Sequence, residues 1–203
     1  MSHYFVNDEK VVSKPRTISY SFKGINFSLE SDNGVFSKND LDKGSELLVE
    51  TLLPLNLGEK ILDIGCGIGV IGLTLAYFTP SMNVCLTDVN TRALSLCSAN
   101  AKTLKLSQRV TILQSDIYTK VEGKFDSIVS NPPIRAGKKV TYEIYNGALG
   151  HLIDGGSLYI VIRKNQGAPS VKSYLEELFG NVTLLAREKG YWVLKATKTI
   201  TSE

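Results

Sequence analysis

The sequence predicts an α/β fold: a mostly parallel sheet of seven strands, with helices on both faces and an antiparallel hairpin of strands at the C-terminal end. Three observations support this prediction. From residue 60 onward, short runs rich in β-branched residues alternate with segments of helical periodicity, which is typical of parallel strands joined by right-handed crossovers. The last two strand-like runs follow one another without a helix between them. The length of 203 residues suits a single domain.

The elements of this sheet follow from local patterns in the sequence. Strands are expected at residues 61–64, 83–89, 110–114, 125–130, 157–163, 182–186 and 191–196, and helices at residues 70–78, 91–104, 141–153 and 170–179. Pro80 ends the first of these helices, and the pair Gly155 and Gly156 ends the third. The fifth strand is the most apolar run of the chain, which predicts an inner position in the sheet.

The first 59 residues follow a different pattern. Two short alternating runs surround Lys23 and Gly24, which predicts a β-hairpin. Its strands are expected at residues 17–22 and 25–29, and a helix is expected within residues 42–55. We interpret residues 1–59 as an extension packed on a domain formed by residues 60–203, so that the chain is one structural domain overall.

Composition and charge exclude several classes of protein. Hydrophobic residues make up 43% of the chain and charged residues 21%, which is typical of a globular protein. The longest uncharged apolar stretch, residues 70–78, is too short to cross a bilayer. The first 16 residues lack the apolar core of a secretory signal, so a cytoplasmic location is expected. The net charge of +3 is concentrated in the C-terminal third, which is compatible with a polyanionic partner.

Cysteine and histidine usage argues against a disulfide framework and a metal site. Cys66, Cys85 and Cys97 are odd in number and never spaced as Cys-x-x-Cys. The two histidines, His3 and His151, are too few and too far apart for a metal cluster. We therefore expect no metal in the catalytic chemistry.

A glycine-rich turn between the first predicted strand and helix of the sheet predicts a nucleotide-like cofactor, and two registers fit it. Residues 67–72, G-I-G-V-I-G, match the dinucleotide pattern G-x-G-x-x-G, with Asp88 placed to bind a ribose. Residues 63–69, D-I-G-C-G-I-G, match the acidic-x-Gly-x-Gly-x-Gly loop of S-adenosylmethionine (SAM) enzymes. In that register Asp63 could help to hold the ammonium group of SAM. The loop by itself leaves the two cofactors open.

The tetrapeptide Asn131-Pro132-Pro133-Ile134 follows the fourth strand, at the edge where parallel sheets bind ligands. Proline has no N–H, and the Asn131 side chain adds a carbonyl oxygen, so the segment offers a rigid cluster of hydrogen-bond acceptors. Such a cluster suits an NH₂ group. Hydrogen bonds to Asn131 Oδ1 and the Pro132 carbonyl would orient the nitrogen and direct its lone pair toward an incoming methyl group.

Together these motifs resemble class I SAM-dependent methyltransferases of the small-domain group, which includes the RsmC-related 16S rRNA guanine-N2 methyltransferases. The resemblance covers residues 15–198. It rests on Asp63-Ile-Gly-Cys-Gly-Ile-Gly69, Asp88, Ser115-Asp116, Asn131-Pro-Pro-Ile134, Gly34-Val-Phe-Ser37 and Leu41-Asp42-Lys-Gly44-Ser45. It implies a Rossmann-like methyltransferase fold, SAM as the cofactor and methylation of an exocyclic base amine in structured RNA. The most specific expectation is guanine N2 of 16S rRNA, with small-subunit rRNA or the assembled subunit as partner.

The resemblance also implies roles for individual residues. Gly65, Gly67 and Gly69 would line the methionine part of SAM, Asp88 would bind its ribose, Asp116 would hold the adenine amine and Asn131 would face the target amine. The expected cofactor-binding residues are Asp63, Gly65, Cys66, Gly67, Gly69, Asp88, Asp116 and Asn131. The expected catalytic residues are Asn131, Pro132, Pro133 and Ile134, and the expected RNA contacts are Arg135, Lys138, Lys139 and Arg163.

The sequence departs from the resemblance at two points. Many amino-methyltransferases have an aromatic residue after Asn-Pro-Pro, which stacks on the target base, whereas this chain has Ile134. The larger RsmC proteins also carry an additional N-terminal methyltransferase-like domain, and a homodimer would replace it here. Tyr191 and Trp192 are interpreted as packing residues of the final hairpin.

Four other functions remain compatible with parts of the sequence. Two are adenine-N6 methylation and protein-glutamine methylation, which also use Asn-Pro-Pro. A third is NAD(P)-dependent oxidoreduction through the dinucleotide register, which leaves residues 131–133 without a role. The fourth is a non-catalytic RNA-binding module.

Overall fold

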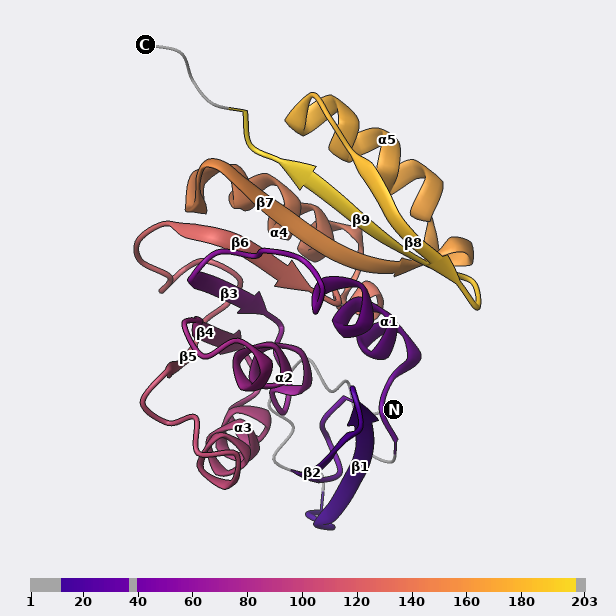
Figure 1. Ribbon diagram of the computed structural model, residues 1–203. Helices are drawn as coiled ribbons and strands as arrows, with labels where there is room; N and C mark the ends of the chain where they lie inside the picture. The colour runs from indigo at the N-terminus through magenta and orange to yellow at the C-terminus, as the bar shows by residue number, and fades with distance from the viewer. Residues whose placement is uncertain (1–11, 37–39, 200–203) are drawn as a thin grey trace.

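The computed structural model describes residues 12–36 and 40–199, except for the side chain of Arg135 (Figure 1). The strands are β1 Arg16–Phe22, β2 Ile25–Ser31, β3 Lys60–Ile64, β4 Asn83–Asp88, β5 Val110–Gln114, β6 Phe125–Ser130, β7 Leu152–Arg163, β8 Thr183–Glu188 and β9 Tyr191–Thr197. The helices are α1 Lys43–Leu52, α2 Val70–Phe78, α3 Thr91–Thr103, α4 Lys138–His151 and α5 Ala168–Phe179, with short 3₁₀ turns η1 Ile134–Ala136 and η2 Lys164–Gln166. Ser37 of the upstream motif lies outside the described residues.

Seven strands form one sheet in the order β5-β4-β3-β6-β7-β9-β8. The five strands from β5 to β7 are parallel, whereas β9 runs antiparallel to both β7 and β8. β7 is an inner strand, as its apolar sequence predicts. The prediction of a mostly parallel seven-stranded sheet with a C-terminal antiparallel hairpin is therefore confirmed.

Helices cover both faces of the sheet. Figure 1 shows α1 and α2 on one side of the sheet and α4 and α5 on the other. Buried side chains of α1, α2 and α3 form one apolar cluster with one face, and those of α4 and α5 form a second cluster with the other. This two-sided cover explains why the parallel strands are almost continuously apolar instead of alternating.

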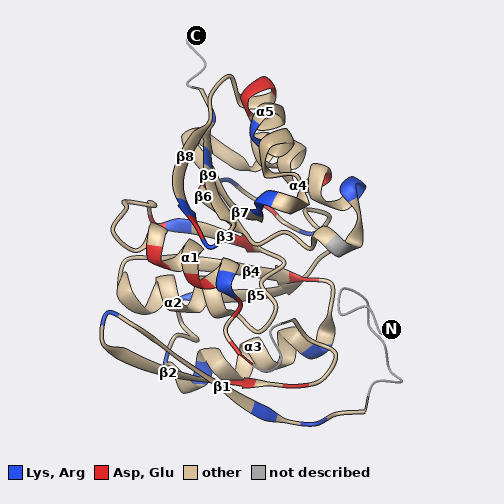
Figure 2. Cartoon of the chain, turned by 90° about the vertical axis from the view of Figure 1, so that its right-hand side faces the viewer, with Lys and Arg blue, Asp and Glu red and all other residues tan. Residues whose placement is uncertain are grey.

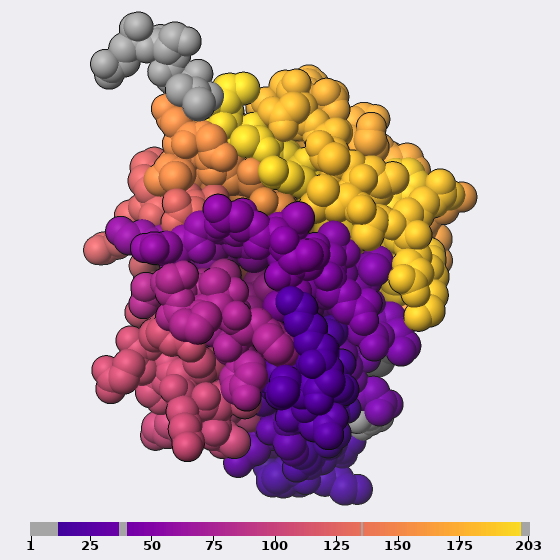
Figure 3. Space-filling model, in the orientation of Figure 1, coloured from indigo at the N-terminus to yellow at the C-terminus, as the bar shows by residue number. Residues whose placement is uncertain are grey.

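The separate hairpin of β1 and β2 packs on the side of the sheet that carries α2 and α3. In the space-filling view its indigo atoms lie against magenta atoms of the following segments (Figure 3). Tyr20 and Phe27 stack with ring centroids 5.1 Å apart, and the Tyr20 and Thr74 hydroxyls of β1 and α2 lie 3.0 Å apart. The Asn100 side chain of α3 also bonds both backbone groups of Glu30 in β2. The hairpin thus shares the core of the sheet, while the boundary at residues 59 and 60 stays a prediction.

The largest difference from the predicted elements lies at Gly155 and Gly156. These glycines fall inside β7, which begins at Leu152, and α4 ends at His151, two residues earlier than expected. Gly155 has a φ of +79°, and its N–H donates to the Lys198 carbonyl. A Cβ on Gly156 would lie within 3.1 Å of three backbone oxygens. The glycines therefore shape an irregular strand, which glycine also permits, instead of ending a helix.

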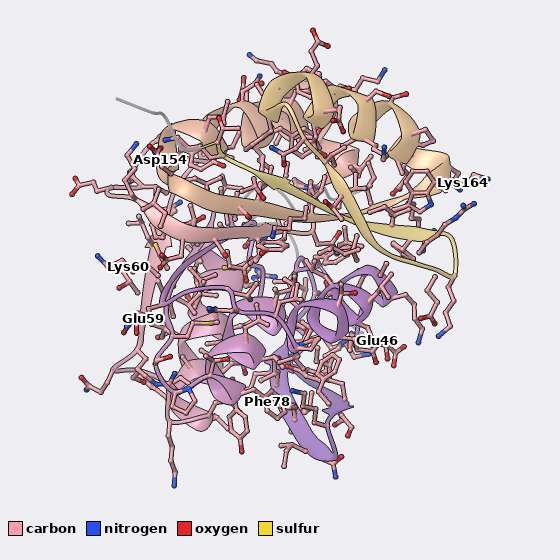
Figure 4. All side chains as sticks on the ribbon, turned by 45° about the horizontal axis from the view of Figure 1, so that its top comes forward. Glu46, Glu59, Lys60, Phe78, Asp154 and Lys164 are labelled. Carbon is pink, nitrogen blue, oxygen red and sulfur yellow. The ribbon has the colours of Figure 1, made fainter. Side chains whose placement is uncertain are left out.

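Parallel pairing brings the carboxyl ends of β3, β4, β5, β6 and β7 to one edge of the sheet. Figure 4 shows Lys164, which follows β7, on the opposite side of the molecule from Lys60 at the start of β3. The glycine loop, Asp88, Ser115-Asp116 and the Asn-Pro-Pro segment all lie at the carboxyl ends of strands. In the described part of the chain, the helices are too short or too polar to span a membrane.

Candidate active site

A cavity of about 770 Å³ opens at the carboxyl edge of the sheet. Its walls come from the ends of five parallel strands and from the start of α1. They include Phe36, Asp42, Gly65, Gly67, Asp88, Gln114, Asp116, Asn131, Pro132, Ile134, Arg163 and Tyr191. The structure thus brings together motifs that lie far apart in the sequence.

The glycine loop forms one wall of this cavity. The backbone N–H groups of Gly65 and Cys66 both donate to the Thr87 carbonyl, over 2.8 and 2.9 Å. Gly65 and Gly67 have φ angles of +70° and +56°, and no heavy atom lies within 4 Å of where their Cβ atoms would be. The backbone at these positions therefore favours glycine, and the space beside it remains open to a ligand.

The rest of the loop packs inward. Gly69 precedes α2, and a Cβ there would collide with Leu73 and the Cys97 sulfur at 2.6 and 2.7 Å. Cys66 is buried and its thiol lies 3.6 Å from the Gly67 carbonyl. Neither Cys66 nor Gly69 is among the cavity-lining residues, so their predicted contacts with a cofactor stay predictions.

Asp88 ends β4 and faces the cavity. Its Oδ2 accepts the Gly67 N–H at 2.9 Å and its Oδ1 accepts the Asn90 N–H at 2.9 Å. Burial raises the pKa of the carboxyl, and the hydrogen bonds from Asn90 and Gly67 oppose this. The Val89 N–H is a third backbone donor to this carboxylate, which can accept about four hydrogen bonds, so capacity for a further donor remains. Asp88 therefore both shapes the loop and can accept a hydrogen bond from a ligand hydroxyl.

Asp63 lies behind the loop instead of on the cavity wall. Its side chain is fully buried, and its Oδ2 accepts the Gly72 N–H at 2.8 Å. Its Oδ1 has no partner among the described residues. Burial raises the pKa of this carboxyl to about 7, and the nearby charge of Asp88 adds to the effect. The structure thus shows how Asp63 supports the start of α2, while its contact with the cofactor ammonium stays a prediction.

Ser115 and Asp116 follow β5 and also line the cavity. The Ser115 hydroxyl donates to the Ile117 carbonyl and accepts the Lys120 N–H, which fixes the turn. Asp116 is exposed beside this turn. Its carboxylate is available to an amino group in the cavity, and its contact with adenine stays a prediction.

Asn131 follows β6, and its side-chain orientation is fixed by the start of α1. The amide Nδ2 donates to Asp42 Oδ2 at 2.8 Å and to Ser45 Oγ at 3.0 Å. Both amide hydrogens are therefore used, while Oδ1 has no hydrogen-bond partner among the described residues. Sequence reasoning treated Asp42 and Ser45 only as markers of a family, because nothing local connects them to a residue 86 to 89 positions away.

The proline carbonyls are less free than the sequence indicates. Pro133 adopts φ −75° and ψ 78°, an inverse γ-turn, and the Ile134 N–H donates to the Pro132 carbonyl at 2.8 Å. The Ala136 N–H likewise donates to the Pro133 carbonyl. A carbonyl has two lone pairs, so the Pro132 oxygen can still accept one hydrogen bond from a ligand.

Arg163 and Tyr191 form another part of the wall, at the end of β7 and the start of β9. Arg163 Nε donates to the Tyr191 hydroxyl at 2.6 Å, and the guanidinium carbon lies 4.8 Å from the centre of the Tyr191 ring. Tyr191 is thus more than a packing residue, because it orients Arg163 in the cavity wall. A Cβ on Gly44 would lie 2.9 Å from both this ring and Asp42 Oδ2, so glycine permits α1 to approach.

The other predicted RNA contacts lie outside the cavity. Lys138 and Lys139 are exposed at the start of α4, and Lys139 Nζ lies 3.9 Å from Glu143 Oε1. Basic residues are coloured blue along the chain in Figure 2. The backbone of Arg135 lies in η1, but its side chain is not described.

Phe36, which sequence reasoning did not select as a site residue, lines the cavity together with Ile134. It supplies an aromatic ring on the wall, although the residue after Asn-Pro-Pro is aliphatic. Phe36 lies 95 positions before Asn131, so only its place in the upstream segment Gly34-Val-Phe-Ser37 could have drawn attention to it.

The family model of the methyltransferase small domain matches residues 26–195, nearly the whole of this architecture. The chain belongs to this family. It is a SAM-dependent methyltransferase. The hypothesis that the glycine loop binds a dinucleotide such as NAD(P) is therefore rejected.

Relatives of this methyltransferase refine the comparison. It is 42% identical over 198 residues to the uncharacterized protein YbxB of Bacillus subtilis, and the match covers 97% of this chain and 98% of YbxB. It is 38% identical over 170 residues to the ribosomal RNA small subunit methyltransferase C of Erwinia tasmaniensis, covering 82% of this chain and 48% of that protein. The chain thus spans about half the length of the methyltransferase C relatives that it matches.

A solved structure shows the same fold. A 16S rRNA N2 methyltransferase (RsmC) from T. thermophilus, in complex with AdoMet and guanosine, superposes with a TM-score of 0.79 and 28% identity. The match covers 91% of this methyltransferase and 50% of that chain. The open space beside Gly65 and Gly67, and the acceptor groups of Asp88, fit SAM in this methyltransferase as well.

Proposed function

We propose that this methyltransferase methylates an exocyclic base amine of structured RNA, and specifically N2 of guanine in 16S rRNA. The observation that carries the proposal is the unpartnered carbonyl of Asn131, among the described residues, in the same cavity as the SAM loop. Relatives named as small-subunit rRNA methyltransferases, and a neighbour solved with guanosine, support this choice of substrate.

The arrangement of acceptors accounts for the chemistry. An amine on a purine is a weak nucleophile because its lone pair is delocalised into the ring. Hydrogen bonds from its two N–H groups to Asn131 Oδ1 and to the Pro132 carbonyl orient the nitrogen and favour its pyramidal form. When bound, SAM supplies an electrophilic methyl group on a positive sulfonium; the N–C bond forms as the S–C bond breaks, and the amine then loses a proton to solvent. Positioning therefore carries the catalysis, and no strong base is required.

Cofactor binding is assigned to the glycine loop and to the ends of β4 and β5. Gly65 and Gly67 leave space for the methionine part, Asp88 accepts the ribose hydroxyls and Asp116 accepts the adenine amine. Asp63 acts from behind the loop, through its bond to Gly72.

RNA binding is assigned to the basic groups around the cavity mouth. Arg163 lines the cavity, and Lys138 and Lys139 extend this surface to the start of α4. Phe36 and Ile134 provide apolar contact for a flipped base, because extruded bases are bound by stacking and by hydrogen bonds to their edges. The partner is small-subunit rRNA, free or in the assembled subunit, in the cytoplasm; a homodimer stays an untested prediction.

Transfer of labelled methyl from SAM to undermodified small ribosomal subunits tests the proposal. The RNA is digested to nucleosides after reaction with the wild type or with Asn131→Ala. We expect label in N2-methylguanosine, lost in the variant. Label in N6-methyladenosine would assign the site to adenine, label in protein would assign it to glutamine amides, and the absence of label in both would contradict RNA methylation.

A further inference from the structure

The amide of Asn131 could sit in either of two orientations related by a half-turn, and only one serves an amine. With the carbonyl toward the cavity the site accepts hydrogen bonds, and with the NH₂ toward the cavity it donates them. A neighbouring group must therefore stabilise one orientation over the other. The hydrogen-bond partners of Asn131 Nδ2 identify this group.

Ser45 does not determine the orientation by itself, because a hydroxyl can accept from an amide NH₂ or donate to an amide oxygen. Here its hydroxyl donates to Asp42 Oδ2 at 3.4 Å, which leaves its oxygen to accept from Asn131 Nδ2 at 3.0 Å. Asp42 determines the orientation, because an ionised carboxylate accepts hydrogen bonds and cannot donate them. Its Oδ2 is 2.8 Å from Nδ2, and a reversed amide would place two oxygens against each other at that distance. The orientation of Asn131 thus depends on Asp42.

We propose that Asp42 is a positioning residue for the target amine. Asp42 holds Asn131 in the orientation in which the reaction site presents hydrogen-bond acceptors. This inference rests on the proposed function and deepens it, because it explains how the site selects an NH₂ group over a ring carbonyl. The bond to a carboxylate also polarises the amide, which makes Asn131 Oδ1 a stronger acceptor.

The position of Asp42 in the fold keeps it rigid. It is the N-cap of α1, and the same Oδ2 accepts the Ser45 N–H at 2.9 Å. Gly44 allows α1 to lie against Tyr191, because a Cβ there would collide with that ring. Helix α1 therefore holds Asp42 at a fixed distance from the end of β6.

Because Asp42 also caps a helix, the test must separate capping from positioning. Asp42→Ser keeps a good N-cap but is too short to reach Asn131, and Asp42→Asn keeps the length and the cap but loses the charge that selects the orientation. For both variants we expect kcat on RNA to fall by roughly 10- to 100-fold, because the target amine is no longer oriented. The KM for SAM should stay within about twofold of wild type, because the glycine loop is unchanged. Unchanged kcat in both variants would show that Asp42 acts only as the N-cap of α1 and would overturn the inference.

Asp126→Asn provides a matched control. Asp126 Oδ2 also accepts two backbone N–H groups, those of Glu59 and Lys60, at the opposite edge of the sheet. We expect this variant to lower the melting temperature about as much as Asp42→Asn while kcat stays at the wild-type value. Equal losses of kcat in the two variants would show a general effect of stability and would overturn the inference.

A rescue experiment tests the polarity of the pair directly. In Asn131→Asp, two carboxylates face each other, and activity should be lost. In the double variant Asp42→Asn, Asn131→Asp, the amide introduced at position 42 can donate to the carboxylate introduced at position 131, and part of the activity should return. A double variant that is no more active than Asn131→Asp would contradict the assigned polarity.

A measurement without substrate keeps this inference separate from the proposed function. The side-chain amide signals of Asn131 can be followed by NMR and identified by their loss in Asn131→Ala. We expect slow hydrogen exchange in the wild type, and fast exchange in Asp42→Ser but not in Asp126→Asn. If the wild type methylates no RNA, the proposed function fails while this exchange still decides the role of Asp42. Equal exchange in the wild type and Asp42→Ser would overturn the inference.

Discussion

The Gly67 N–H donates to Asp88 Oδ2 across 2.9 Å, which joins the glycine loop after β3 to the end of the neighbouring strand β4. One carboxylate thus shapes the loop and, at the same time, faces the cavity that the loop borders. Loop geometry and the proposed ribose binding therefore depend on the same side chain.

Replacing Asp88 by alanine should weaken SAM binding by about 1–3 kcal/mol, the cost of leaving a polar partner without its hydrogen bond. Isothermal titration with SAM measures this change. Asp88→Asn should lose less, because its carbonyl oxygen can still accept from Gly67 or from a hydroxyl. Unchanged affinity in Asp88→Ala would contradict the ribose assignment.

Replacing Asn131 by alanine should abolish methyl transfer and leave SAM affinity nearly unchanged. The side chain is held by the start of α1 and makes no hydrogen bond to the glycine loop in the described structure. Single-turnover kinetics and titration with SAM separate the two effects. A collapse of SAM affinity would show that Asn131 binds the cofactor more than the target amine.

Gly65→Ala should strongly reduce SAM binding, because its Cβ would enter the open space beside the loop. Gly24→Ala in the β1–β2 hairpin is the matched control. Gly24 has a φ of +76°, close to the +70° of Gly65, and its Cβ also meets no heavy atom within 4 Å. Both variants should lose about 1 kcal/mol of stability from backbone strain. If Gly24→Ala weakens SAM binding equally, strain alone explains the effect.

The pKa of Asp63 predicts a pH dependence of stability. Burial raises this pKa to about 7, so the folded protein keeps a proton that the unfolded chain has already lost. The free energy of unfolding should therefore decrease between about pH 4 and pH 7, by roughly 4 kcal/mol from this group, and level off above. Asp63→Asn removes the charge and keeps an acceptor for Gly72. Its stability should depend less on pH in this window, as measured by denaturation across pH; identical profiles would contradict the burial argument.

Arg163→Gln should raise the KM for RNA and lower the salt dependence of binding, because one phosphate contact or base contact is lost. Tyr191→Phe should have a smaller effect of the same kind, since it removes the hydroxyl that accepts from Arg163 Nε. Lys172→Gln on α5 provides the same change of net charge outside the cavity wall. RNA affinity measured at several salt concentrations distinguishes them. Equal losses in Arg163→Gln and Lys172→Gln would indicate a non-specific charge effect.

The sheet, the cofactor and most of the motifs could be predicted from the sequence. Periodicity located β6 and α2 at both ends, because apolar runs bounded by glycine, proline and polar residues are local signals. Parallel topology then placed the motifs at one edge, since each lies at the carboxyl end of a strand. The helix stop predicted at Gly155 and Gly156 was wrong, because their backbone geometry depends on pairing with the chain near Lys198.

How the site is held could not be predicted, because it depends on contacts between distant parts of the folded chain. The bond from Asn131 to Asp42 joins residues 89 positions apart, and the approach of α1 to Tyr191 depends on Gly44, which has no local signal of this role. The pKa of Asp63 likewise depends on complete burial. Spacing in the sequence shows which side chains reach the carboxyl edge of the sheet. The direction of their hydrogen bonds and their burial depend on the residues that the fold places beside these side chains.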